Sequence, residues 1–122
     1  MTDARLPILI AEDEAMLRVL AVEMLEDAGF KVFEAGDGVE ALELLKANPQ
    51  IRLLVSDIKM PRMDGYALVT AGLAFKPELK VLLMTGYAED PPPQFLKVRD
   101  VQILHKPFNL ERLCTLAVEM TA

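Results

Sequence analysis

The stretch LLVSDIKMPRMDG, residues 53–65, shows most clearly how this chain folds. It begins with a largely apolar run, residues 53–56, and a continuous run of this kind is typical of a parallel strand covered on both faces. Asp57 follows at the carboxyl end of the predicted strand, where open parallel α/β sheets bind their ligands. The loop after it leads into a helix predicted over residues 64–75.

Strand-like and helix-like segments alternate on both sides of this stretch. Other strands are predicted at residues 7–11, 31–35, 79–84 and 101–104, and other helices at residues 14–28, from Asp37 to just before Asn48-Pro49, and after a cap at Asn109. Asp37 is placed to cap its helix, with Glu40 three residues on as a capping-box partner. Five strand–helix units imply an α/β fold, a doubly wound parallel sheet with helices on both faces.

The segment of residues 86–100 breaks this alternation, since a fourth helix is expected there. Its Pro91-Pro92-Pro93 run lacks three successive backbone donors, so a helix can begin only at or after the last proline. The fourth helix is therefore expected to be irregular or shortened to about two turns.

Helical spacing predicts which side chains of the first and last helices face the sheet. In the first helix, the predicted inner residues are Leu17, Leu20, Ala21, Met24 and Leu25. In the last helix they are Leu110, Leu113, Cys114 and Ala117, so Cys114 is expected to be a core thiol.

Length and composition exclude several classes of protein. The 122 residues correspond to one domain, residues 1–122. The net charge of −6 argues against a face that neutralises nucleic-acid phosphates. No apolar run is long enough to span a bilayer, and no signal peptide is visible. With Cys114 as the only cysteine, neither a disulfide framework nor a cysteine-based zinc site is possible, and a cytoplasmic protein is expected.

Acidic, hydroxyl and basic side chains stand at the carboxyl ends of the predicted strands. Glu12 and Asp13 follow the first strand, Asp57 the third, Thr85 the fourth and Lys106 the fifth. Carboxylates gathered this closely repel one another, and a hard divalent cation relieves the repulsion. Mg²⁺ fits best, because it takes few protein carboxylates and keeps water and phosphate oxygens as ligands. With the lysine, such a site would hold a phosphoryl group between a donor and a carboxylate oxygen.

Four fragments of the sequence resemble a known family. They are LIAEDE at residues 9–14, SDIKMPRMDG at 56–65, MTG at 84–86 and HKPF at 105–108. In this order and at strand ends, they resemble the response-regulator receiver domain of two-component signalling, with a domain core of about residues 6–120. The resemblance implies the (βα)5 flavodoxin-like, or CheY-like, sheet of strand order 2-1-3-4-5. It also suggests a stand-alone single-domain response regulator.

The resemblance further implies a Mg²⁺ site. Asp13 and Asp57 would ligate the ion directly, together with the backbone carbonyl of Lys59. Glu12 would act through a metal-bound water.

The same resemblance makes Asp57 the phosphoacceptor. It would take a phosphoryl group from a phosphohistidine on a histidine kinase or a histidine phosphotransfer protein. Thr85 would hydrogen-bond that group and Lys106 would form an ion pair with it. The protein would then change conformation and control a protein partner, as a monomer or weak dimer with no membrane or nucleic-acid partner. It would catalyse only its own phosphorylation and dephosphorylation, so it is not expected to be an enzyme in the ordinary sense.

Other functions fit these residues less well. An aspartate-nucleophile hydrolase needs a second aspartate two residues after the nucleophile, where this chain has Lys59. A flavin carrier needs a hydroxyl- and glycine-rich phosphate loop after the first strand, where Glu12, Asp13 and Glu14 would repel a phosphate. Two further alternatives are a receiver domain excised from a hybrid histidine kinase and a pseudo-receiver that is never phosphorylated. The pseudo-receiver is disfavoured because the acidic residues, the threonine and the lysine are all present.

One position departs from the family pattern. Many receivers carry an aromatic residue three positions before the active-site lysine, and here that position is Ile103. Since no ring can swing there, the signal is expected to pass from Thr85 through Tyr87 into residues 87–100.

Overall fold

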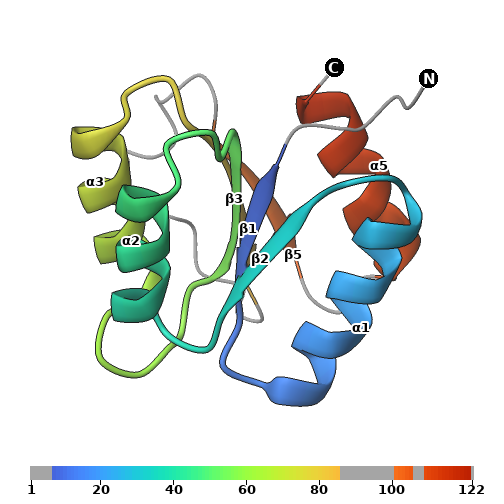
Figure 1. Ribbon diagram of the computed structural model, residues 1–122. Coiled ribbons are helices and arrows are strands. Elements are labelled where there is room, and N and C mark those ends of the chain that lie inside the picture. The colour runs from blue at the N-terminus through green and yellow to red at the C-terminus, as the bar shows by residue number, and fades with distance from the viewer. Residues whose placement is uncertain (1–6, 86–100, 106–108, 122) are drawn as a thin grey trace.

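The chain folds around a five-stranded parallel sheet. The structure is a computed structural model that describes residues 7–85, 101–105 and 109–121. The described elements, in chain order, are β1 (Ile8–Ala11), α1 (Ala15–Asp27), β2 (Val32–Ala35), α2 (Gly38–Ala47), β3 (Leu53–Asp57), α3 (Gly65–Phe75), β4 (Lys80–Thr85), β5 (Val101–His105) and α5 (Leu110–Met120). The strand order is β2-β1-β3-β4-β5 with all neighbours parallel, which confirms the predicted fold. Helices α2 and α3 cover one face of the sheet and α1 and α5 the other (Figure 1).

The central strands divide the core into two layers. In β1, Ile8 and Ile10 pack with residues of α1 and α5, while Leu9 and Ala11 pack with residues of α2 and α3. Every residue of β1 and β3 is buried. Successive side chains of a strand point to opposite faces, so a strand covered on both faces needs apolar residues at every position. This explains the continuous apolar runs of the sequence.

Side-chain caps set where three helices begin. Asp37 accepts a hydrogen bond from the amide of Glu40 at 2.8 Å, and Asn109 accepts one from the amide three residues on at 2.7 Å, as predicted. The Glu40 carboxylate does not close the expected capping box, and accepts from the amide of Gly36 at 2.7 Å. Helix α3 begins one residue later than predicted, because Asp64 is its cap.

The predicted inner face of α1 is partly wrong. The buried residues of this helix are Ala21, Val22 and Leu25. Leu20 is 48% exposed and Met16 is 73% exposed. Because α1 carries apolar residues on more than one face, hydrophobic spacing alone does not single out the face that packs on the sheet.

The predicted inner face of α5 is also partly wrong. Cys114 is partly buried, and it lines an open groove beside Met24 and Val118 rather than the core. The buried residues of α5 are Leu113, Leu116, Ala117 and Met120. The expectation of a core thiol is therefore corrected.

Some expectations for the second half of the chain fall outside the described residues. These are the shortened fourth helix and the signal route through Tyr87, which both belong to residues 86–100. Ile103 is described, and it lies in β5 and packs partly buried against the core layer of α2 and α3. None of the helices in the described part of the chain has the length and apolar character needed to cross a bilayer.

Candidate metal and phosphoacceptor site

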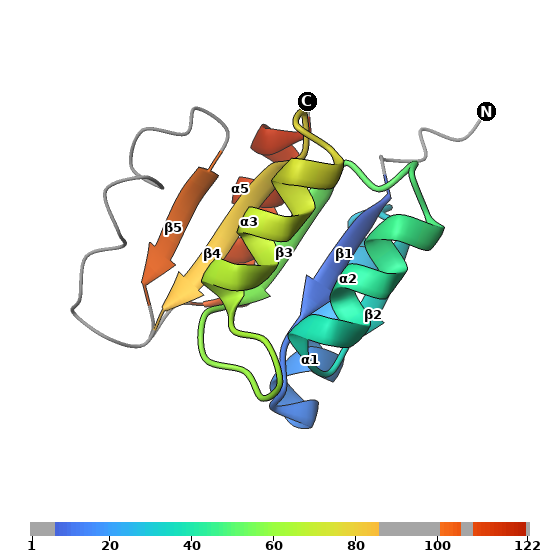
Figure 2. The ribbon, with the colours of Figure 1, turned by 90° about the vertical axis from the view of Figure 1, so that its left-hand side faces the viewer.

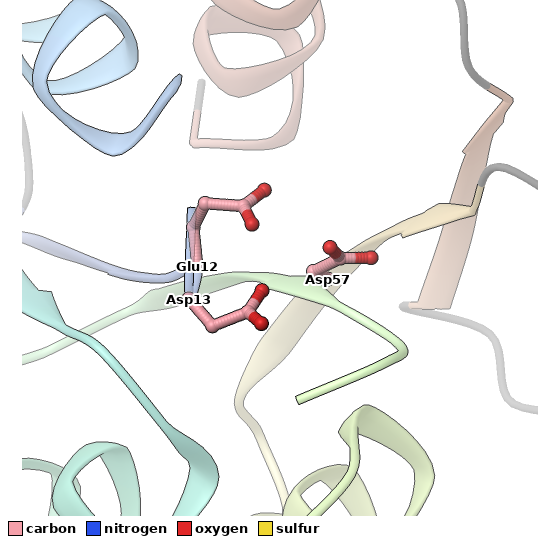
Figure 3. Close-up of side chains that lie close together, drawn as sticks. All are labelled: Glu12, Asp13 and Asp57. Carbon is pink, nitrogen blue, oxygen red and sulfur yellow. The ribbon is translucent and has the colours of Figure 1, made fainter. Parts of the chain in front are cut away.

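Three carboxylates from two neighbouring strands form the centre of the site. In the parallel pairing of β1 with β3, Ala11 lies opposite Ser56, so the residues that come next in each chain segment, Glu12 and Asp57, lie side by side. The carboxylate groups of Glu12, Asp13 and Asp57 each offer an oxygen, and these oxygens lie within 4.8 Å of one another. Figure 3 shows Glu12 and Asp13 at the end of β1 beside Asp57 of β3.

Backbone hydrogen bonds hold these carboxylates in place. The Glu12 amide donates to the carbonyl of Ala35 in β2 at 3.0 Å, and the Glu12 carboxylate accepts from the amide of Glu14 at 3.1 Å. The Asp57 carboxylate accepts from the amide of Ile58 at 2.8 Å. Glu12 is 1% exposed and Asp57 is 8% exposed. The two side chains are therefore both buried and oriented by the main chain.

A close approach of backbone segments shapes the loop after Asp57. The amide of Gly65 donates to the carbonyl of Ile58 at 2.7 Å. A Cβ on Gly65 would lie 2.5 Å from the carbonyl oxygen of Asp57, closer than any side chain allows. Glycine at this position thus lets α3 begin directly against the end of β3.

The donor set suits a hard divalent cation. The three groups are all carboxylates, and oxygen ligands of this kind bind Mg²⁺ and Ca²⁺ rather than softer metals. Two of the three are buried, where the repulsion between like charges is less screened than in water. A cation between them relieves this repulsion, so the residues present fit a metal ion of the predicted class.

The other predicted site residues differ in how far the structure describes them. Thr85 is the last residue of β4 and is 5% exposed; it lies one residue beyond Met84, which pairs with Asp57. Lys59 lies exposed in the loop between β3 and α3. Lys106 lies outside the described residues.

Two arginines form ion pairs around the site that no sequence pattern indicates. Arg18 forms an ion pair with Glu34 at 3.2 Å, and Arg62 forms one with Asp37 at 3.0 Å. Neither pair has a helical i to i+4 spacing, which is the pattern that marks an ion pair in a sequence. Asp37 was predicted only as a helix cap, and no signal in the sequence pairs it with an arginine.

The paired Asp37 carboxylate makes stability depend on pH in a defined direction. The Glu40 amide and then the Arg62 guanidinium hold the pKa of Asp37 below its ordinary value. Such a carboxylate stabilises the fold fully above its unfolded pKa of about 3.9 and loses that contribution as pH falls through the folded pKa. We expect the urea concentration at the midpoint of unfolding to be higher for wild type than for Asp37→Asn near neutral pH. This difference between the two midpoints, or gap, should close below about pH 4. A gap that is the same at all pH values would contradict this.

The chain is similar to receiver domains of known proteins. The sequence model of the family described as the response regulator receiver domain matches residues 8–118. The sensor kinase CckA of Brucella abortus (strain 2308) is 37% identical over 115 residues, which cover 93% of this chain and 12% of the kinase. The response regulator receiver protein CpdR of the same organism is 39% identical over 107 residues, which cover 87% of this chain and 88% of CpdR.

A solved receiver domain is also similar to this chain in structure. The receiver domain of the hybrid histidine kinase CckA matches with a TM-score of 0.82 and 31% sequence identity, covering 95% of this chain and 99% of that domain. The chain thus spans a small part of the sensor kinase and most of CpdR.

Proposed function

The chain belongs to the family of response regulator receiver domains, and on that premise we propose that Asp57 is its phosphoacceptor and that Mg²⁺ is its metal. Receivers of two-component and phosphorelay signalling are phosphoacceptors rather than conventional enzymes. The observation that carries the proposal is the carboxylate cluster of Glu12, Asp13 and Asp57 at the carboxyl ends of β1 and β3. Such an all-carboxylate cluster with two buried members suits a divalent cation, and a bound cation would let a negatively charged phosphoryl group approach Asp57.

The proposed chemistry is phosphoryl transfer to a carboxylate oxygen. An oxygen of Asp57 attacks the phosphorus of a phosphohistidine; the new O–P bond forms as the P–N bond breaks, and the imidazole leaves. The backbone amide of Ile58, 2.8 Å from the carboxylate, orients it for attack. Thr85 would donate its hydroxyl to a phosphoryl oxygen, and Lys106 would pair with the group's negative charge.

The metal would be held by this chain's oxygen atoms. Asp13, Asp57 and the backbone carbonyl of Lys59 would be direct ligands, and Glu12 would act through a water. When bound, Mg²⁺ would neutralise charge on the phosphoryl oxygens, which could occupy the coordination positions that the protein does not fill. Phosphoryl transfer depends mainly on positioning and charge neutralisation, and these residues would provide both.

A histidine kinase or a histidine phosphotransfer protein would be the donor, as the family implies. We propose a cytoplasmic setting, in keeping with a chain whose one cysteine gives no disulfide framework. The output would be control of a protein partner by a monomer or weak dimer. A pseudo-receiver role remains the competing function, and it differs in one measurable respect, since a pseudo-receiver needs no Mg²⁺.

The metal dependence of phosphorylation tests the proposal. Purified protein incubated with acetyl phosphate and Mg²⁺ should gain one phosphoryl group by intact-mass spectrometry, and EDTA should prevent the gain. Ca²⁺ in place of Mg²⁺ should support it poorly, because Ca²⁺ prefers longer bonds and more ligands. Phosphorylation that is indifferent to EDTA would contradict the metal assignment, and no phosphorylation at all would favour the pseudo-receiver.

A further inference from the structure

Two arginine side chains join the loops of the site to one segment, residues 34–38, which runs from the last two residues of β2 to the first residue of α2. The first is Arg18 of α1. Its Nη1 donates to the backbone carbonyl of Glu12 at 2.7 Å, and its Nε donates to the Glu34 carboxylate at 3.2 Å. A single planar guanidinium thus joins the end of β1 to β2, and its rigidity restricts movement of the main chain at Glu12.

The second is Arg62, in the loop that follows Asp57. Its Nε and Nη2 donate to the two carboxylate oxygens of Asp37 at 3.1 Å each. Arg62 has φ of 67°, an unfavourable value for a residue with a side chain, and the Met63 amide donates to the Pro61 carbonyl across it at 2.7 Å. Backbone of this kind persists only where surrounding contacts hold it.

The first turn of α2 packs against the same loop. A Cβ on Gly38 would lie 2.2 Å from the carbonyl oxygen of Met63 and 2.7 Å from the Met63 Cβ. Figure 2 shows the loop between β3 and α3 beside the start of α2. The loop is therefore held twice at neighbouring points, by the Arg62–Asp37 ion pair and by close packing on Gly38.

We propose that Arg18 and Arg62 are positioning residues of the metal site, and that residues 34–38 are the common frame from which both act. This inference rests on the proposed function, since it concerns the same site. Arg18 fixes the main chain that carries Glu12 and leads to Asp13. Arg62 fixes the loop that carries the backbone carbonyl of Lys59.

Electrostatics and positioning predict opposite effects when these arginines are removed. Arg18→Gln or Arg62→Gln makes the surroundings of the site more negative, and by Coulomb attraction alone this tightens the binding of a divalent cation. Loss of positioning does the reverse, because groups that orient metal ligands typically contribute about 10- to 100-fold in metal affinity. We expect each variant to bind Mg²⁺ about 10-fold more weakly by isothermal titration calorimetry.

A matched control and two double variants sharpen this measurement. Arg52→Gln makes the same charge change just before β3, at the opposite end of the strand from the site, and should leave the Mg²⁺ affinity unchanged. Adding Asp37→Asn, which keeps a capping side chain, to Arg62→Gln should lower the Mg²⁺ affinity no further, because the two residues form one ion pair. In the double variant Arg18→Gln/Arg62→Gln, the fold-losses in Mg²⁺ affinity of the two single variants should multiply, because these arginines hold different loops.

Amide hydrogen exchange on the metal-free protein gives a readout that does not depend on Mg²⁺. Exchange of the Met63 and Gly65 amides should be faster in Arg62→Gln, and exchange of the Glu14 amide should be faster in Arg18→Gln. If both variants exchange as wild type does, the positioning role is wrong. It is also wrong if wild type binds Mg²⁺ and both variants bind it as tightly or more tightly. Wild type that binds no Mg²⁺ would instead contradict the proposed function.

Discussion

Asp57→Asn will carry no phosphoryl group under conditions in which acetyl phosphate and Mg²⁺ modify the wild type. The amide that replaces the carboxylate is not a nucleophile, so loss of labelling should be complete rather than partial. The variant should fold, because the carbonyl oxygen of asparagine can still accept from the Ile58 amide, which lies 2.8 Å from the Asp57 carboxylate. Intact-mass spectrometry before and after alkaline treatment, which removes acyl phosphates, measures the result.

The same loop supplies a matched control for this experiment. Asp64→Asn makes an identical chemical change at the cap of α3, where asparagine serves as well as aspartate. It should be phosphorylated like the wild type. Asp57→Asn should also be at least as stable as wild type without metal, because it removes one of three mutually repelling carboxylates. Equal labelling of Asp57→Asn and wild type would show that the phosphoryl group goes elsewhere.

Most of the fold could be predicted because it follows from local patterns. The continuous apolar runs of β1 and β3 and the caps at Asp37 and Asn109 depend on residues close together in the chain. The ends of the strands could be predicted less exactly. β3 continues one residue past its apolar run, because Asp57 still pairs with Met84 of β4. The carboxylate cluster joins residues far apart in the chain, but it could also be predicted, because parallel strands bring their carboxyl ends to one edge of the sheet.

The arginine contacts that hold the site could not be predicted, because they join residues far apart in the sequence that no strand pairing brings together. Arg18 lies 16 residues from Glu34, and Arg62 lies 25 residues from Asp37. In a sequence, an arginine and a carboxylate at such a separation look like ordinary surface residues. Which of them meet depends on how α1 and α2 pack on the sheet, and hydrophobic spacing misjudged even which face of α1 packs there.

The glycine at the start of α2 gives the largest expected effect on stability. Gly38→Ala places a methyl group 2.2 Å from the Met63 carbonyl oxygen, which belongs to the backbone and cannot turn aside. The loop must therefore move, and overpacking of this kind typically costs about 1–3 kcal/mol, so we expect a loss near the upper end of that range. For a domain of this size this corresponds to a fall in Tm of roughly 10 °C, measured by calorimetry or circular dichroism.

A second glycine provides the comparison that isolates this clash. Gly72→Ala makes the same substitution inside α3, where the new methyl would meet only the side-chain ends Leu45 Cδ1 at 3.3 Å and Leu79 Cδ2 at 3.4 Å. These ends can shift, and alanine favours a helix over glycine by about 1 kcal/mol, so the Tm should stay close to that of wild type. Gly38→Ala should also weaken Mg²⁺ binding, because the displaced loop carries the Lys59 carbonyl, whereas Gly72→Ala should not. If both variants were equally stable, the contact between α2 and the loop after Asp57 would not constrain the site.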